Sequence, residues 1–181
     1  MIRLKSLLRE ISEDNIDRLL DKIKQKQFRL LAAGDNGRVY EIDGEDNVFK
    51  ITQERDEIEV ASVIVGRWTE FTTFIPVYYV NEQESMFIMA NADELSNADK
   101  MHINEFMVGY ARYAREQGGE VSIFDYLDAD GARNTDVETV NFLRALQQDI
   151  QRTGIEELDL DLDFRADNVM RWNGKMVMVD W

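Results

Sequence analysis

Residue types that often carry function are scarce in this chain of 181 residues. It has no cysteine, a single histidine, His102, and a single proline, Pro76. The absence of cysteine excludes a disulfide framework and a thiolate metal site, and one histidine leaves almost no material for a catalytic triad or a zinc cluster. This composition is consistent with a reducing environment, and we predict a cytoplasmic location.

Long apolar runs and excess positive charge are also missing. No segment approaches the roughly 20 apolar residues of a membrane span, and none near the N-terminus has signal-peptide length. Thirty-six acidic residues against 21 basic ones give a formal net charge of -15, which repels nucleic-acid phosphates and anionic membrane surfaces. We therefore expect neither a nucleic acid nor a membrane as partner.

The first half of the chain alternates short apolar runs with polar turns. Residues 3–26 have helical periodicity, and so do residues 54–66. Short β-rich runs separated by turn residues predict strands. These runs are residues 28–33, 39–42, 48–52, 74–80 and 86–89. The pattern predicts a five-stranded antiparallel sheet with one helix.

The second half is mainly helical. Helical spacing covers residues 99–117 and 135–153, and Asn173-Gly174 separates two apolar runs as the turn of a β-hairpin would. We therefore predict an α+β fold. Its parts are an N-terminal helical segment (1–27), a sheet-containing part (28–91) and a helical part that ends with the hairpin (92–181).

A glycine pair precedes a lysine in the predicted sheet. Gly34 and Gly37 lie between two strands, where the lack of side chains lets backbone N–H groups approach a polyphosphate. Lys50 follows on the next strand between apolar neighbours, so its charge would project beneath that hairpin. An ordinary glycine turn and a solvated strand lysine are the alternatives. A lysine in a cleft needs a counter-charge, for which Glu57 is our first choice and Glu59 the second.

The strongest local signal is an acidic motif near the end of the sequence. Asp163 is followed five residues later by Asn168, and Asp180 follows the predicted hairpin. These groups can converge as one proton acceptor and two oxygen ligands for Mg²⁺. The alternative is an acidic loop that caps a helix or binds calcium. The apolar strands on either side favour the first interpretation.

Taken in order, these features resemble the protein-kinase-like superfamily over roughly residues 28–181. In that family a glycine-rich hairpin covers the ATP phosphates, a strand lysine paired with a helix glutamate holds them, and a hinge after the fifth strand holds the adenine. The resemblance implies a two-lobed fold that binds ATP. Its glycine hairpin contains Gly34 and Gly37, Lys50 pairs with Glu57, and the hinge runs from Met89 to Asn91.

The same resemblance implies Asp163 as the catalytic base, and Asn168 and Asp180 as Mg²⁺ ligands. The ending Val179-Asp180-Trp181 looks closer to the Ile-Asp-Trp of aminoglycoside and choline phosphotransferases than to the Asp-Phe-Gly of protein kinases. The small size and strong acidity also resemble proteins encoded by tailed bacteriophages, which would place the protein in the host cytoplasm. Departures from the family pattern are Ala32, where protein kinases have their first glycine, and Asp161-Leu162, where they have His-Arg.

Two functions follow from the resemblance. The first is an ATP- and Mg²⁺-dependent phosphotransferase acting on a hydroxyl of a small molecule or protein, with a cationic acceptor favoured by the net charge. The second is a pseudokinase-like module that binds a nucleotide or a protein and regulates or inhibits a partner. Because the sequence ends one residue after Asp180, we expect a truncated second lobe. The acceptor would then be held by residues 92–134, with an acidic loop around Asp125, Asp128 and Asp130, or by a partner protein that completes the lobe.

Overall fold

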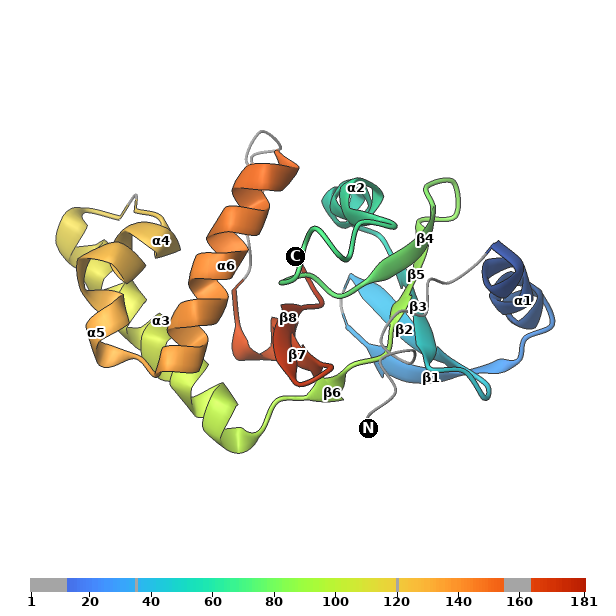
Figure 1. The fold of residues 1–181 in the computed structure, drawn as a ribbon, viewed down its shortest axis with the longest axis horizontal. Coiled ribbons are helices and arrows are strands. Elements are labelled where there is room, and N and C mark those ends of the chain that lie inside the picture. Colours follow the sequence, from blue (N-terminus) through green and yellow to red (C-terminus); the bar gives the residue numbers. More distant parts are fainter. Residues whose placement is uncertain (1–12, 35, 120, 155–163) are drawn as a thin grey trace, which may run out of the picture.

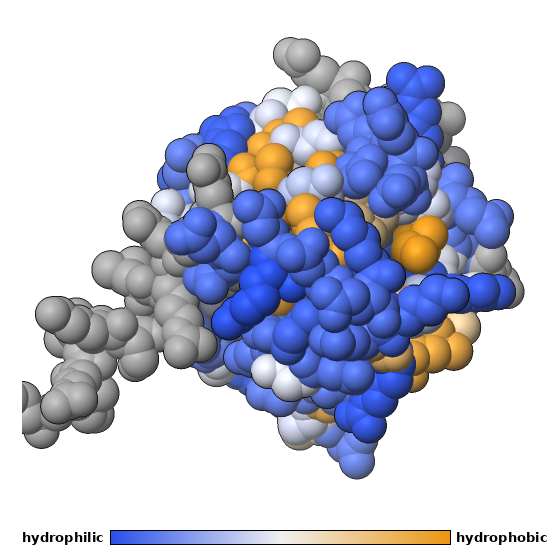
Figure 2. All heavy atoms as spheres, turned by 90° about the vertical axis from the view of Figure 1, so that its right-hand side faces the viewer, coloured by the Kyte–Doolittle hydropathy of each residue, from blue (hydrophilic) through white to orange (hydrophobic). Residues whose placement is uncertain are grey.

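The computed structural model describes residues 13–34, 36–119, 121–154 and 164–181. The sheet and the first two helices lie at one end of the molecule and the remaining helices at the other, with a small hairpin and the C-terminal residue between them (Figure 1). No helix among these residues is long and apolar enough to cross a membrane. At the end that carries the first helix and the sheet, hydrophilic residues cover most of the surface and apolar side chains show between them (Figure 2).

The first part of the chain forms a five-stranded antiparallel sheet. Its strands are β1 (Phe28–Ala33), β2 (Gly37–Ile42), β3 (Asn47–Thr52), β4 (Val77–Asn81) and β5 (Met86–Ala90), in the spatial order β1-β2-β3-β5-β4. Helix α1 (Glu13–Lys24) precedes the sheet, and α2 (Arg55–Ile64) connects β3 to β4. The predicted α+β class, with five antiparallel strands and one helix between the third and fourth, is confirmed.

One predicted strand begins later than expected. The run 74–80 was expected to be a single strand, but β4 starts at Val77. Pro76 has no backbone N–H to donate, and its carbonyl accepts a hydrogen bond from the N–H of Ala90. Phe74 instead forms a single parallel bridge with Met178, far along the chain. This bridge ties the approach to β4 to the C-terminal hairpin.

The helical part contains two long helices and a compact segment between them. It consists of α3 (Asn97–Gln117), α4 (Ile123–Tyr126), a π-helical turn (Leu127–Gly131), α5 (Ala132–Asn134) and α6 (Val137–Thr153). Ser96 begins α3 through a capping box with Asp99, and the side chain of Asp136 caps α6. The expectation of an acidic loop around residues 125–130 was wrong. Asp125 forms a second capping box with Ser122, so its carboxylate caps the N-terminus of α4.

The C-terminal hairpin consists of β7 (Val169–Trp172) and β8 (Lys175–Met178), as predicted. Asn173 (φ 49°) and Gly174 (φ 78°) both have positive φ, as a two-residue type I′ turn requires. A short strand that the sequence did not predict, β6 (Asp93–Glu94), pairs with β7 and completes a three-stranded sheet. β6 is two acidic residues long, so it has no apolar alternation that could have revealed it.

One hydrophobic core joins the two parts of the molecule. Buried side chains of β3, α2 and β5 pack in the same cluster as those of α3, α6 and the hairpin. A smaller cluster lies under α1 and contains Leu19, Ile42, Phe49, Met86 and Ile88. Because the main cluster is continuous, the hairpin is held in a defined position relative to the sheet.

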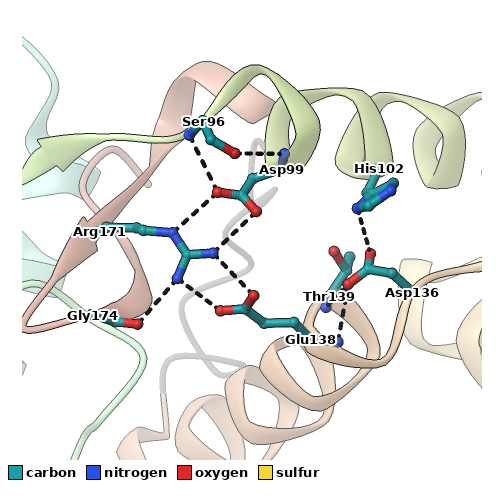
Figure 3. Close-up of polar contacts among 8 residues, drawn as sticks. All are labelled: Ser96, Asp99, His102, Asp136, Glu138, Thr139, Arg171 and Gly174. Carbon is teal, nitrogen blue, oxygen red and sulfur yellow. Dashed lines mark hydrogen bonds and ion pairs between the residues drawn. The ribbon is translucent and has the colours of Figure 1, made fainter.

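Arg171 of β7 connects the hairpin to both long helices (Figure 3). Its guanidinium donates to Asp99 of α3 (Nε to Oδ2, 3.0 Å) and to Glu138 of α6 (Nη1 to Oε1, 2.8 Å), as well as to the carbonyl of Gly174. These hydrogen bonds raise the pKa of Arg171, and the bond from Arg171 lowers the pKa of Asp99 although burial acts in the opposite direction. Beside this network, His102 contacts Asp136 at 3.4 Å.

The lowered pKa of Asp99 makes the stability of the fold depend on acidity. Because the folded protein holds this carboxyl ionised more strongly than the unfolded chain does, the stabilisation is present above about pH 4 and is lost as the pH falls through the folded-state value. We expect Arg171→Met to lower the free energy of unfolding by about 2 kcal/mol near pH 7, and by less near pH 3. Urea unfolding at both pH values measures this. Arg38→Met, at an exposed arginine of β2, is the control, and an equal loss at both pH values would contradict the assignment.

Candidate functional site

Lys50 lies at the meeting point of three segments. It projects from β3, is only 7% exposed, and its ammonium donates to Glu57 of α2 and, at 2.8 Å, to Oδ1 of Asp180 beyond β8. Lys50 and Asp180 are 130 residues apart in the sequence. The structure therefore brings together three of the residues that the sequence singled out.

The sequence left Glu57 and Glu59 open as partners of this lysine, and the geometry selects Glu57. Glu57 lies on the buried face of α2 with 1% exposure, whereas Glu59 points outward and pairs with Arg55 at 2.7 Å. The apolar neighbours Ile58 and Ala61 hold that face of α2 against the core. Glu57 is thus directed at Lys50 by the same burial that orients the helix.

Burial and charge set the protonation of this pair. Burial raises the pKa of Glu57 to about 7, against the opposing effect of the Lys50 charge. At Lys50 burial favours the neutral amine, but the charge of Glu57 and the hydrogen bond to Asp180 outweigh it and raise the pKa of the ammonium. Lys50 is therefore a fixed cation at neutral pH.

Asp180 is the accessible member of the cluster. Its side chain is 49% exposed, so its carboxylate faces solvent as well as Lys50. The next residue, Trp181, is buried and packs against Phe74 and Phe87 with ring centroids 5.8 and 6.1 Å away. The Trp181 indole N–H also donates to the carbonyl of Glu57 at 3.2 Å. Trp181 thereby anchors Asp180 beside the Lys50–Glu57 pair.

Asn168 is connected to the same segment through the backbone. It ends a 3-10 turn (Ala166–Asn168), is buried, and its carbonyl accepts from the N–H of Val179 at 3.0 Å. This bond places Asn168 next to the residue before Asp180. Amide and carboxylate oxygens are the kinds of ligand that Mg²⁺ prefers.

The glycine turn lies over Lys50, but only one glycine is sterically required. A Cβ at Gly37 would come within 2.9 Å of the carbonyl oxygen of Ile51 and 3.1 Å of Cε of Lys50, whereas a Cβ at Gly34 would meet nothing within 4 Å. The N–H of Gly34 donates to the carbonyl of Gly37 and closes the turn. Close approach of this backbone to Lys50 therefore depends on Gly37.

Asn36 fixes this turn, and the sequence analysis did not identify it. Its side chain donates to Glu54, and its carbonyl accepts from the N–H of Gln53 at 2.8 Å and from the hydroxyl of Thr52 at 3.3 Å. These bonds join the turn to the end of β3 and the start of α2. An asparagine between two glycines was the available signal, but turn residues of this kind are common.

The residues of the predicted hinge lie at the end of β5. Met89 is buried in β5 and Asn91 follows that strand; the N–H groups of Ala90 and Asn91 already donate to the carbonyls of Pro76 and Asp46. Asp163 lies outside the described residues. Within the described residues, no group of three or more His, Cys, Asp or Glu side chains is arranged to hold a metal ion.

Comparisons with known proteins find a distant likeness to solved structures and none in sequence. No family model and no curated protein matches the sequence. A solved structure of the phosphotransferase APH(2″)-IIa, in a ternary complex with streptomycin and ATP, matches 96% of this chain and 71% of its own, at 16% identity and a TM-score of 0.36. A likeness of this size carries no argument about function.

Proposed function

We propose that this protein binds ATP together with Mg²⁺ and transfers the terminal phosphoryl group to a hydroxyl. The observation that carries the proposal is the position of Lys50, a buried cation held by Glu57 and by a half-exposed carboxylate, Asp180. A lysine that only stabilised the fold would not need a second, solvent-facing carboxylate. A cation fixed beside an accessible acid is what a metal-bound polyphosphate requires.

Each residue around Lys50 is assigned a role in this proposal. The ammonium of Lys50 contacts the phosphates, and Glu57 orients it. The turn at Gly34 and Gly37 lies over the phosphates, and the segment from Met89 to Asn91 contacts the adenine. Residues 28–91 would thus form the nucleotide-binding part, residues 92–181 would supply the remaining groups, and residues 1–27 would be an N-terminal helical segment.

The donor set fits a magnesium ion. Asn168 and Asp180 provide one amide and one carboxylate oxygen, and Mg²⁺ is commonly held by one or two such protein groups with phosphates and waters as the other ligands. When bound, the metal neutralises charge on the phosphates. The exposure of Asp180 leaves room for this contact.

Asp163 is assigned the role of orienting the acceptor hydroxyl and accepting its proton. The residue after it, Phe164, is buried and packs against Phe106 and Phe142 with ring centroids 6.3 and 6.2 Å away. The chain is therefore anchored immediately after Asp163 and again at Asn168. With a net charge of -15, the protein would favour a cationic acceptor, either a small amine-bearing molecule or a basic patch of a protein.

Calorimetric titration of ATP into the protein, with and without Mg²⁺, tests the proposal. We expect binding that depends on Mg²⁺ and is lost in Asp180→Ala, because this variant removes a metal ligand and a partner of Lys50. We expect Asp163→Ala to retain binding and to stop phosphoryl transfer. Transfer is measured with labelled ATP against small amines that carry hydroxyl groups and against basic proteins.

The matched control is Asp167→Ala, an exposed aspartate in the same turn as Asn168. It should change neither binding nor transfer. Mg²⁺-dependent binding without transfer to any acceptor would favour the pseudokinase-like module. The absence of ATP binding in the wild-type protein would exclude both nucleotide functions.

A further inference from the structure

A buried carboxylate lies on the apolar face of α6. Asp149 is 3% exposed, and its neighbours on that face, Leu146 and Ile150, are part of the main hydrophobic core. Burying an ionised carboxylate costs free energy unless hydrogen bonds compensate for the lost water, and an apolar residue would follow the helical pattern without this cost. Residues that break the local pattern in this way are expected where the structure needs a specific contact.

Asp149 holds Thr73, which lies in the connection from α2 to β4. Its Oδ2 accepts from the backbone N–H of Thr73 at 3.0 Å and from the Thr73 hydroxyl at 2.8 Å. Both residues are buried, so water has little access to replace these bonds. The other oxygen, Oδ1, lies 3.7 Å from Nη1 of Arg152, whose side chain is exposed. Thr73 is therefore fixed to α6 through its backbone and its side chain together.

The other side of Thr73 is bonded to the C-terminal hairpin. Its carbonyl accepts from the N–H of Met178 at 2.7 Å, and the N–H of Ile75 donates to the carbonyl of Met178 at 2.9 Å. Phe74, between them, forms the parallel bridge with Met178. Met178 is two residues before Asp180, so a chain of hydrogen bonds runs from α6 through Thr73 to the segment that carries Asp180. In Figure 1 α6, the end of the α2–β4 connection and the C-terminal residue lie close together.

The segment that carries Asp180 is thereby held from two directions. On one side, Trp181 packs on Phe74 and donates to the carbonyl of Glu57. On the other side, the bonds through Thr73 hold it to α6. Hydrogen bonds require a defined distance and angle, and a metal ligand must be placed to within about 0.5 Å. Two attachments of this kind restrict the position of Asp180 more than either does alone.

We propose that Asp149 is a positioning residue for the nucleotide site. By holding Thr73, it sets the position of Asp180 beside Lys50. The part of this inference that concerns Mg²⁺ and ATP rests on the proposed function, whereas the placement of the segment does not. Lys50 keeps its bond to Glu57 when Asp149 is lost, so the defect falls on the carboxylate that contacts the metal. Asp149 thus acts on metal binding without touching the nucleotide or the metal.

Calorimetric titration of ATP at a series of Mg²⁺ concentrations is the first test, on the full chain and well below the melting temperature of each variant. We expect Asp149→Ala to raise about tenfold the Mg²⁺ concentration that gives half-maximal ATP binding, because two bonds to a carboxylate are lost. Asp149→Asn should keep a nearly wild-type value, since its amide oxygen can accept the same two bonds. The matched control is Leu19→Ala, which truncates a buried side chain in the cluster under α1 and should lower stability without changing the Mg²⁺ dependence.

Thr73→Val removes only the hydroxyl bond and keeps the shape of the side chain. We expect it to raise the same Mg²⁺ concentration about threefold in the wild-type protein and to add nothing in the Asp149→Ala background, because the two residues act through one contact. Should Asp149→Ala fail to fold, Thr73→Val against the wild type gives the deciding comparison, and an unchanged value there would contradict the proposal.

Hydrogen exchange tests the placement of the segment without a nucleotide. In Asp149→Ala the amide of Met178 and the indole N–H of Trp181 should exchange about tenfold faster than in the wild type, beyond the uniform increase in Leu19→Ala. If the increase at these two groups only matches that in Leu19→Ala, or if the two variants change the Mg²⁺ dependence equally, Asp149 only stabilises the fold and the proposal is wrong. If the wild-type protein binds no ATP, the proposed function is wrong, and the exchange rates alone decide whether Asp149 places this segment.

Discussion

Replacing Lys50 by methionine should both destabilise the protein and abolish ATP binding. The substitution leaves Glu57 buried without its cation, and breaking a buried pair in this way costs about 3 kcal/mol or more. Because burial already raises the pKa of Glu57 to about 7, the carboxyl can take up a proton, so we expect the low end of that cost. Urea unfolding gives the stability and calorimetry gives the ATP affinity.

A double variant separates the two effects. In Lys50→Met/Glu57→Gln the buried charge is gone, so most of the lost stability should return, while ATP binding should remain absent. Lys175→Met is the matched control, because Lys175 is an exposed strand lysine of the hairpin. If Lys50→Met is as stable as this control, Lys50 and Glu57 do not form a buried charge pair in solution.

Trp181→Ala is expected to have the second large effect. Removing a buried tryptophan that packs on two phenylalanines should lower the free energy of unfolding by about 3–5 kcal/mol. It should also weaken Mg²⁺-dependent ATP binding, because Trp181 holds Asp180 beside Lys50 through its packing and its bond to the Glu57 carbonyl. Both quantities are measured as for Lys50→Met.

Trp181→Phe distinguishes the contribution of packing from that of the indole hydrogen bond. It keeps an aromatic ring in the core but removes the indole N–H, so we expect a loss of about 1 kcal/mol and a smaller change in ATP affinity. Equal losses in Trp181→Ala and Trp181→Phe would show that the hydrogen bond, and not the packing, anchors this segment. A loss under about 1 kcal/mol in Trp181→Ala would show that the C-terminal residue is not part of the core.

Much of the fold could be predicted because its signals are local. The Asn173-Gly174 turn requires positive φ at two successive residues, and few other dipeptides allow that. The long helices α3 and α6 follow apolar periodicity and end at Gly118 and Gly154, which both adopt the left-handed conformation. Strand β6 and the π-helical turn could not be predicted, because partners distant in the sequence hold them in place.

The sequence by itself determined the residue types, their order along the chain, and the alternation of short strands with polar turns in the sheet. From these alone Lys50, Glu57, Asn168 and Asp180 could be named as candidates. Glu57 was preferred to Glu59 as the partner of Lys50, but the choice stayed open because both lie on the same helix. Tertiary structure decided that choice through the packing of α2. It also brought Lys50 to Asp180 across 130 residues, through the bridge from Phe74 to Met178 and the burial of Trp181. Contacts of this kind depend on how the hairpin packs against the sheet, and no local pattern encodes them.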